Sequence, residues 1–322
     1  MSKKYVAGLL LCLIAALSWG GTYPVMAAAL KTIDPFYLTL VRYVIVAVIF
    51  ALLLLLVEGP TAFKAEGQTV RLWVFGAAGF LGFNFLVFPG QQLAGASGSI
   101  IASVMMAVQP LLAVLVTWIY RGTKPTIVSL LSMLVAALGV FMVVTKGHIS
   151  VLFSSRNTLL AMGLLLLGEL SWVVYTVGGT DFPKWSILRY TAHTSIRGVI
   201  LIAVTVAVAT GAGWLKIPSA GQIIDVRWPL LYLISFAGVV GIFAWNMGNR
   251  IVTPLNGILF MNLVPITSFV ITIIGGYTVS WFELAGCAIT IAALVGNNLY
   301  GRYAAKKMEQ VSQLGSSSDF GV

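Results

Sequence analysis

Residues 35–57 read PFYLTLVRYVIVAVIFALLLLLV, a long apolar stretch that is interrupted by one charged residue, Arg42. A helix needs about 20 mostly apolar residues to cross the hydrocarbon core of a bilayer. Backbone amides have no water partners in that core, so a long apolar run satisfies them by folding into a helix. The stretch therefore predicts a membrane-spanning helix, and it leads us to expect an all-α membrane protein.

The composition of the whole chain supports the same fold class. Of its 322 residues, 59% are hydrophobic and only 9% are charged, with a mean hydropathy of +1.00. A soluble domain has about 25% charged residues, so lipid must cover most of the surface of this protein. The net charge of +10 does not indicate nucleic acid binding here, because the charges lie in short loops and follow membrane topology.

Ten segments of the required length follow one another, separated by short stretches that are polar or rich in glycine and proline. Twelve of the 19 Lys and Arg residues fall on the side of the termini, five fall opposite, and two lie inside segments. This bias places both termini in the cytoplasm, and we expect a multi-pass protein of the plasma or inner membrane. The predicted spans are 5–28, 35–57, 70–91, 97–119, 126–145, 158–178, 186–210, 228–247, 256–277 and 282–302.

Five pairs of spans share a local sequence feature at nearly the same offset. Trp and Arg are scarce, so the matches that include them weigh more than the Ala-Ala-Leu match. The pairs are Leu17-Ser18-Trp19 with Leu170-Ser171-Trp172, Arg42 with Arg197, Ala78-Gly79-x-x-Gly82 with Ala237-Gly238-x-x-Gly241, Pro110 with Pro265, and Ala136-Ala137-Leu138 with Ala292-Ala293-Leu294.

The repeat predicts two five-helix units, residues 1–150 and 151–303, followed by a disordered cytoplasmic tail, 304–322. Because five is an odd number of spans, the second unit must enter the membrane in the opposite direction. Inverted-topology repeats are typical of transporters, since two inverted halves can expose a central site to each side in turn.

These motifs resemble those of the drug/metabolite transporter superfamily, and specifically its EamA-type group. The resemblance covers nearly the whole chain and implies a ten-span secondary transporter whose site is lined by spans 1, 3, 4, 6, 8 and 9. Many relatives carry a Glu after spans 4 and 9, where this chain has Tyr120-Arg121-Gly122 and Gly275-Gly276-Tyr277. The residues that carry the resemblance are Leu17-Ser18-Trp19-Gly20, Arg42, Val108-Gln109-Pro110-Leu111 and Leu259-Phe260-Met261-Asn262-Leu263-Val264-Pro265.

Glu169 is the only acidic residue well inside a predicted span. A charged side chain at the bilayer centre costs about 3 kcal/mol, so such a residue faces a cavity, forms a pair or takes a proton. Loss of hydration favours the protonated carboxyl, which suits a proton-coupling group. The alternative is a neutral Glu that bonds two helices together.

Aromatic and amide side chains inside the spans are the other candidates for binding a solute. Aromatic faces can hold apolar or cationic groups, and prolines beside the amides free backbone carbonyls a turn earlier. The alternatives are an interfacial aromatic belt and hydrogen bonds between helices. The predicted substrate-binding residues are Trp19, Tyr23, Asn84, Gln109, Glu169, Trp172, Tyr175, Trp245, Asn246 and Asn262.

Two arginines fall inside predicted spans. Arg42 either extends to the interface or lines the cavity, and Arg197, its repeat partner, follows His193 by one helical turn. Arg197 could bind a substrate carboxylate through two hydrogen bonds. The alternative is that both arginines cap helix ends or contact lipid headgroups.

Together these features predict a secondary transporter that exports a small organic metabolite, with an amino acid or related amine favoured, by alternating access around a midplane site. The alternative within transport is a lipid-linked or amphipathic, drug-like substrate. An enzyme is not expected, because the chain has few acids and two His. No metal or cofactor is expected, the protein would act as a monomer in the lipid bilayer, and its partner is a small organic solute.

Overall fold

The computed structural model describes residues 3–148, 156–252 and 258–318, and within these ranges the secondary structure is entirely helical. Among the described residues, eight helical stretches are long and apolar enough to cross a membrane, which confirms an all-helical membrane protein. Their bounds are Lys3–Ala29 (α1), Pro35–Glu58 (α2), Thr69–Leu93 (α3 to α4), Ile127–Thr145 (α7), Asn157–Asp181 (α9 and the turn after it), Ile187–Gly211 (α10), Arg227–Val252 (α12 to α13) and Trp281–Gly301, within α16.

Two further predicted spans have irregular counterparts. The segment predicted at 97–119 is a pair of helices, α5 (Gly98–Ala107) and α6 (Gln109–Arg121), bent by 46° at their junction. Pro110 lies in the first turn of α6 and cannot donate a backbone hydrogen bond to the preceding turn. The segment predicted at 256–277 corresponds to η6 (Ile258–Asn262) and the shorter helix α15 (Leu263–Ile274), and its first two residues lie outside the described ranges.

Local chemistry fixes several helix ends. At the start of α2, the Asp34 side chain accepts hydrogen bonds from the backbone N–H groups of Phe36 and Tyr37, and Pro35 occupies the first turn. At its end, Gly59 adopts a positive φ of 77°, which glycine accommodates without strain. The apolar stretch 35–57 is therefore a single helix with a defined beginning and end.

Two spans contain a π-helical segment. η2 (Ala77–Gly82) lies between α3 (Thr69–Gly76) and α4 (Phe83–Leu93), and η5 (Leu233–Val240) lies between α12 (Arg227–Tyr232) and α13 (Gly241–Val252). Both coincide with the repeated Ala-Gly-x-x-Gly motif. Such segments are rare and often occur at functional sites. Hydropathy did not predict them, because a π turn leaves the apolar character of a span unchanged.

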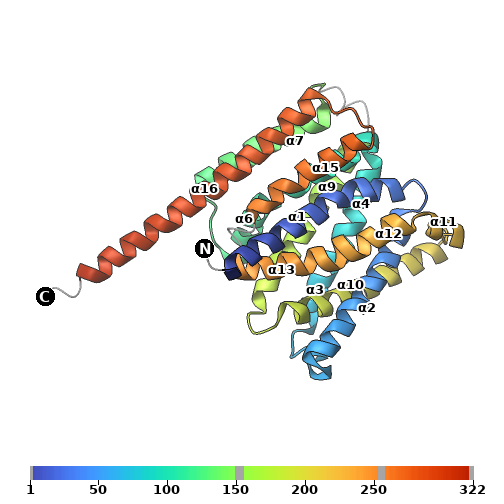
Figure 1. Cartoon of the computed structure of the whole chain (residues 1–322), viewed down its shortest axis with the longest axis horizontal. Coiled ribbons are helices and arrows are strands. Elements are labelled where there is room, and N and C mark those ends of the chain that lie inside the picture. Colours follow the sequence, from blue (N-terminus) through green and yellow to red (C-terminus); the bar gives the residue numbers. More distant parts are fainter. Residues whose placement is uncertain (1–2, 149–155, 253–257, 319–322) are drawn as a thin grey trace.

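The helices form a bundle with one helix pair at each edge (Figure 1). α7 packs along α16 at one edge, and α2 packs along α10 at the other. Between them, α1 contacts α13 and α15, while α9 (Arg156–Gly178) contacts α4 and α6. The interior helices that surround the centre are therefore α1, α4, α5, α6, α9, α13 and α15.

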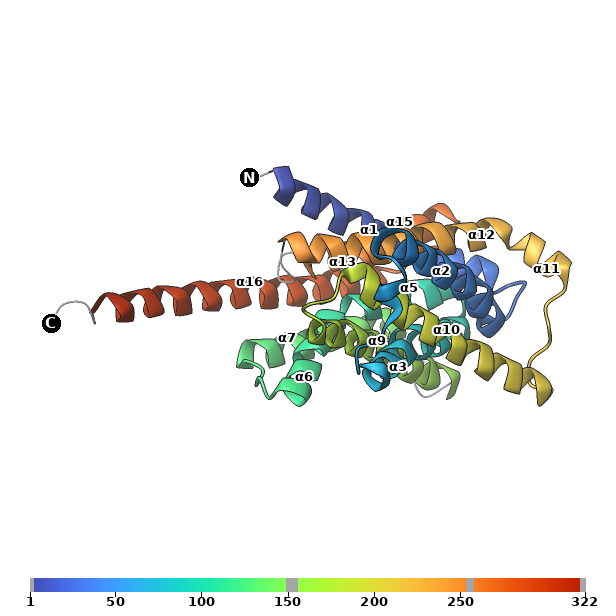
Figure 2. The ribbon, with the colours of Figure 1, turned by 90° about the horizontal axis from the view of Figure 1, so that it is seen from below.

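The C-terminal tail differs from its prediction. α16 continues as a helix to Ser318 and projects beyond the bundle (Figure 2), whereas a disordered tail was predicted for 304–322. Residues 304–318 contain Ala, Lys, Met, Glu, Gln and Leu, which favour helix, and no proline. Residues 319–322 lie outside the described ranges.

Candidate functional site

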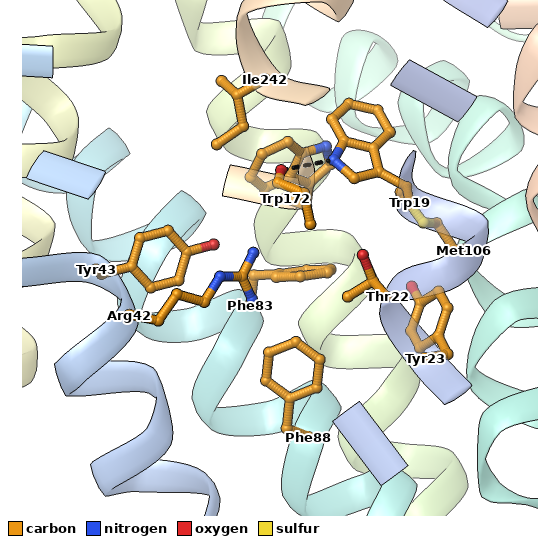
Figure 3. A pocket seen from close by; sticks show the side chains of 11 residues that line it. Trp19, Thr22, Tyr23, Arg42, Tyr43, Phe83, Phe88, Met106, Trp172 and Ile242 are labelled. Carbon is orange, nitrogen blue, oxygen red and sulfur yellow. Dashed lines mark hydrogen bonds between the residues drawn. The ribbon is translucent and has the colours of Figure 1, made fainter. Parts of the chain in front are cut away.

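A small cavity of about 30 Å³ lies at the centre of the bundle, among α1, α2, α4 and α9. Its wall is mainly aromatic, and its polar side chains include Arg42 and three that carry a hydroxyl, Thr22, Tyr23 and Tyr43 (Figure 3). We call it the first cavity. It is lined by Trp19, Thr22, Tyr23, Arg42, Tyr43, Phe83, Phe88, Met106, Trp172, Ala237 and Ile242.

Arg42 is the one charged residue in this wall. It is only 3% exposed, and its guanidinium carbon lies 4.6 Å from the centre of the Tyr43 ring and 6.0 Å from that of Phe88. Figure 3 shows the guanidinium reaching into the space between Tyr43 and Phe83. Within the part of the chain that the structure describes, its Nε and Nη1 have no hydrogen-bond partner.

A second cavity of about 50 Å³ shares one wall with the first. Trp172 lines both, so its indole belongs to the partition between them. Trp172 lies 6.0 Å from Trp19, and Trp19 lies 5.4 Å from Trp245, measured between ring centres. The second cavity is lined by Gln109, Pro110, Ala113, Trp172, Val173, Thr176, Val177, Trp245 and Met261.

Glu169 is fully buried on α9, one helical turn before Trp172. The Tyr23 hydroxyl donates a hydrogen bond to its Oε1 at 3.3 Å, and the Gln109 amide donates to its Oε2 at 2.5 Å. Tyr23 lines the first cavity and Gln109 lines the second. The carboxyl of Glu169 is therefore hydrogen-bonded to the wall of each cavity.

The π-helical segment η5 positions Trp19. The Trp19 indole N–H donates a 3.2 Å hydrogen bond to the carbonyl of Ala237 (Figure 3). A Cβ added at Gly241 would stand 2.8 Å from Trp19 Nε1 and 2.9 Å from the carbonyl oxygen of Phe236. Glycine at 241 thus allows the π turn and the indole to lie against each other.

The other π-helical segment packs against α9 in a similar way. A Cβ at Gly79, in η2, would lie 2.6 Å from Cγ of Tyr175. The Tyr175 ring is 5.0 Å from that of Trp172, which lines both cavities. Tyr175 therefore lies between η2 and this shared wall.

The structure brings together some of the predicted site residues. Trp19, Tyr23 and Trp172 line the first cavity, Gln109, Trp172 and Trp245 line the second, and Glu169 lies between them. Four others are not in either wall. Tyr175 packs behind Trp172, Asn84 donates to the carbonyl of Phe80 at 2.7 Å, Asn246 donates to Thr191 at 3.4 Å, and Asn262 is buried at the start of α15.

The two arginines of the repeat lie in different surroundings. Arg197, predicted as a possible carboxylate partner, donates to the backbone carbonyl of His193 at 3.0 Å and contacts the His193 ring. It lines neither cavity, whereas Arg42, which the sequence left open, lines the first. The aromatic wall from Tyr43, Phe83 and Phe88 was also missed, because apolar residues cover every face of these spans.

A polar cluster closes one end of the bundle beside a larger cavity of about 330 Å³. Lys146 donates to the Tyr277 hydroxyl at 2.7 Å and lies 3.6 Å from Glu283, and Tyr277 bonds Ser97 at 2.9 Å. Burial disfavours the charged ammonium, but the Tyr277 hydrogen bond and the Glu283 charge outweigh it and raise the pKa of Lys146. The cluster thus ties α7 and α16 to the start of α5.

Polar contacts of a different kind close the opposite end. Tyr120 donates to Asp181 at 2.5 Å and Arg121 pairs with the same carboxylate at 3.2 Å, which joins the ends of α6 and α9. Nearby, Arg189 lies 2.8 Å from Glu66, and hydrogen bonds from Arg189 and Trp185 lower the pKa of Glu66. Each end of the interior helices is therefore held by a few polar side chains.

The sizes of the two central cavities indicate which state the structure represents. A cavity with room for about one probe sphere, roughly 10–15 Å³, can hold a water molecule, and small-molecule sites usually enclose about 300–1,000 Å³. At about 30 and 50 Å³ the central cavities are too small for an organic solute. A solute can occupy them only after the surrounding helices move apart.

Comparison with known proteins gives a consistent result. Residues 6–145 match the EamA-like transporter family. The uncharacterized transporter YrdR of Bacillus subtilis (strain 168) is 39% identical over 92% of each chain, and the uncharacterized transporter YyaM of the same strain is 26% identical over 79% of this chain and 81% of its own.

A crystal structure of another protein has the same fold, with a TM-score of 0.67 at 19% identity over 93% of this chain and 99% of its own. The helical architecture, the central cavities and the similarity to YrdR along nearly the whole length agree with the family match. The chain belongs to the EamA-like transporter family of the drug/metabolite transporter superfamily, and it is a membrane transporter rather than an enzyme.

Proposed function

We propose that this protein is a secondary transporter that exports a small organic metabolite by alternating access around the two central cavities. The observation that carries the proposal is the position of Glu169 and Trp172. One indole separates the cavities, and one carboxyl is bonded to both walls. A small movement of α9 would change the access to both sides of this partition at once.

The ten-span inverted repeat is part of the proposal, with units 1–150 and 151–303. Helix contacts support it, because they come in matched sets. α1 packs on α13 and α15 as α9 packs on α4 and α6, and η5 packs on α2 as η2 packs on α10. The family match ends at residue 145, the last residue of α7 and shortly before residue 150, where the first unit would end.

The orientation is proposed from charge and supported by the placement of the ends. The start of α1 and the end of α16 lie toward the same end of the bundle (Figure 2), as an even number of spans requires. With the positive-inside rule, this end faces the cytoplasm. The second cavity then lies on the cytoplasmic side of Trp172, and the first lies on the outer side.

Glu169 is the proposed coupling group. A carboxyl that is buried between two hydrogen-bond donors can alternate between a proton and its partners as the helices move. Gln109 and Tyr23 come from α6 and α1 of the first proposed unit, whereas Glu169 lies on α9 of the second. Protonation of Glu169 would weaken its links to both helices and so connect proton uptake to the change of access.

The favoured substrate is an amino acid or a related amine, and the favoured direction is export. The aromatic walls of both cavities suit the apolar part of such a molecule. The remaining predicted site residues, Tyr175, Asn84, Asn246 and Asn262, would act from behind these walls or in an opened state.

The test is flux in proteoliposomes that contain the purified protein. Labelled amino acids, amines and nucleosides are offered in pools, with and without a pH gradient. Accumulation of one pool that depends on the gradient is the expected result. Downhill flux that ignores the gradient would keep the transporter and remove the role of Glu169, whereas the absence of any flux from folded protein would contradict the proposed substrates.

A second candidate is an amphipathic substrate that reaches the site from the membrane. A mainly apolar groove of about 530 Å³ lies among α1, α2, α10 and the η5–α13 span, with Glu58, Ser186 and Arg250 among its lining residues. It would suit a substrate with an apolar body and a polar end. If Leu53→Trp, placed in this groove, inhibited flux of amphipathic drugs but not of amino acids, the second candidate would be favoured.

A further inference from the structure

We propose that Arg42 binds the carboxylate of the transported solute, so that the substrate is an organic anion or zwitterion with an apolar body rather than a simple amine. The proposal rests on the proposed transport function and specifies the substrate class for the same site. It is carried by the position of one buried, unpaired guanidinium in the wall of the first cavity.

A buried charge without a partner is unfavourable, because it has lost its hydration and gained nothing in return. Arg42 is only 3% exposed, and its Nε and Nη1 make no hydrogen bond within the described ranges. The ion pairs found in these ranges involve other residues, namely Arg121, Lys146 and Arg189. The guanidinium therefore has donors available for a group that the described residues do not provide.

Its aromatic neighbours do not satisfy those donors. The Tyr43 and Phe88 rings lie 4.6 and 6.0 Å from the guanidinium carbon and stabilise its charge through their faces. Such contacts leave the N–H groups, which lie in the guanidinium plane, without acceptors. A carboxylate can accept two parallel hydrogen bonds from this plane, a geometry for which arginine is well suited.

Glu169, whose partner Tyr23 lines the first cavity, already has hydrogen-bond partners of its own. Its two oxygens accept from Tyr23 and Gln109, and no ion pair joins it to Arg42 in the described part of the chain. The first cavity thus presents the unpaired guanidinium of Arg42 beside aromatic rings, while the carboxyl of Glu169 is hydrogen-bonded to Tyr23 and Gln109. This charge arrangement favours an anionic group on the solute and disfavours an isolated ammonium.

The rest of the first cavity suits an apolar body. Trp19, Phe83, Phe88 and Trp172 form most of the wall, and Figure 3 shows the Phe83 and Phe88 rings beside the guanidinium. Thr22 donates its hydroxyl hydrogen to the Ser18 carbonyl at 3.2 Å, so its oxygen keeps the capacity to accept a hydrogen bond.

The experiment compares two probes that share an apolar body and differ in charge. Binding of 3-phenylpropionate and of 3-phenylpropylamine to the purified full-length protein is measured by isothermal titration calorimetry at pH 7. The carboxylate is expected to bind and the amine to bind at least about tenfold more weakly, since the charge-assisted hydrogen bonds are made only by the carboxylate.

Variants assign the effect to one residue. Arg42→Gln is expected to weaken 3-phenylpropionate binding by about tenfold or more, and Arg42→Lys is expected to restore part of it because the positive charge returns. Arg197→Gln is the matched control, because Arg197 has the corresponding position in the repeat but lines neither cavity, and it should leave binding unchanged. The charge preference of the unmodified protein tests the proposal even if a variant fails to fold.

Three results would overturn the proposal: the amine binds as tightly as the carboxylate, neither probe binds, or folded Arg42→Gln retains full affinity for 3-phenylpropionate. The proposed transport function is tested separately by flux. Binding of the carboxylate without flux of any solute would support the role of Arg42 and contradict transport. Flux of amines but not of carboxylates would support transport and contradict the role of Arg42.

Discussion

Glu169 and Arg42 are two ionisable residues buried near the centre of the bundle, and they differ in how their hydrogen-bonding groups are satisfied. Glu169 accepts hydrogen bonds from Tyr23 and Gln109. Arg42 has aromatic contacts but two unpaired nitrogens within the described residues. One group is tied to the helices and the other is available to a solute, which suggests a division between coupling and binding.

Replacement of Glu169 by Gln tests the coupling role. Glu169→Gln keeps the size of the side chain and can keep its hydrogen bonds, but it cannot exchange a proton. We expect accumulation driven by a pH gradient to be lost while downhill exchange continues. Flux is measured in proteoliposomes at several pH values, with Asp225→Asn as the control, because Asp225 is an exposed acid at the end of the short helix α11 (Ala220–Asp225). Full transport with an unchanged pH dependence in Glu169→Gln would remove the coupling role.

The sequence could identify Glu169 because an acid is conspicuous within an apolar span, but it could not identify the residues around Arg42. In a soluble helix, apolar periodicity marks the buried face. In α2 both the lipid-facing and the interior faces are apolar, so the sequence pattern does not distinguish a buried residue from an exposed one. Tyr43 is buried, whereas its neighbour Val44 is exposed. The aromatic wall is formed by the packing of several helices against one another, which the sequence pattern of a single helix does not reveal.

At the element scale, the two π-helical segments are the least regular parts of the interior helices, and both adjoin the residues that wall the cavities. η5 holds the Trp19 indole through the carbonyl of Ala237, and η2 presses on Tyr175 behind Trp172. A π turn holds one more residue than the α-helical turn that it replaces, so the helix is less regular there. We therefore infer that these segments are where the interior helices bend when access changes.

A methyl group at Gly241 should impair this movement. In Gly241→Ala the new Cβ would meet Trp19 Nε1 and the Phe236 carbonyl at less than 3.0 Å, so the π turn or the indole must shift, at about 1–3 kcal/mol. We expect a clear loss of flux with a smaller loss of thermal stability. Gly163→Ala on α9 is the control, because nothing lies within 4 Å of its Cβ. Equal flux in both variants would contradict the role of η5.

The close packing of α7 against α16 at one edge of the bundle is expected to stabilise the protein. A Cβ at Gly286 would lie 2.4 Å from the carbonyl oxygen of Gly139, so the two backbones touch there. Gly286→Ala should destabilise the pair by about 1–3 kcal/mol and lower the unfolding temperature in detergent. Gly296→Ala, on the same helix but with open space around it, should not. A similar unfolding temperature for both variants would show that the close approach is unimportant.

The positions of most helices followed from hydropathy, and the predicted limits of α2 and α7 agree with the structure to within a residue. The irregular elements did not follow. Pro110 and the Ala-Gly-x-x-Gly motifs permit a bend and a π turn, but they do not require them, because both depend on what packs against the helix. Beyond its predicted span, α16 continues as a helix to Ser318, over polar residues for which the sequence predicts a disordered tail.

At the scale of the whole molecule, the interior helices of one proposed unit pack against those of the other. The sequence repeat predicted two related units, but it could not show that α1 contacts α13 or that α9 contacts α4. Such contacts depend on side-chain fit between apolar surfaces, which hydropathy does not distinguish. Because of these contacts, a movement of one unit would change its packing against the other.

The polar cluster of Lys146, Tyr277 and Glu283 should hold its end of the bundle closed. Lys146→Met removes the ion pair and the hydrogen bond to Tyr277, so we expect that end to open more often. A cysteine placed at Ala94, in the adjoining cavity, should then react several-fold faster with a membrane-impermeant thiol reagent. Native Cys12 and Cys287 are buried, which keeps the background low.

The control for this experiment is the same kind of change at the opposite end of the bundle. Arg121→Met breaks the pair with Asp181 and should not accelerate labelling at position 94. If Lys146→Met and Arg121→Met had the same effect on that rate, the two clusters would not act as separate closures.

The unpaired guanidinium of Arg42 also has an electrical consequence. Moving one elementary charge across the membrane potential is worth about 2.3 kcal/mol per 100 mV. While Glu169 is protonated, the site with an anion bound is neutral, and its reorientation senses little of the voltage. Empty, it carries a positive charge, and an inside-negative potential draws it back toward the cytoplasm. The resting voltage of the cell would thus reset the empty carrier after each export cycle, even without an ion gradient.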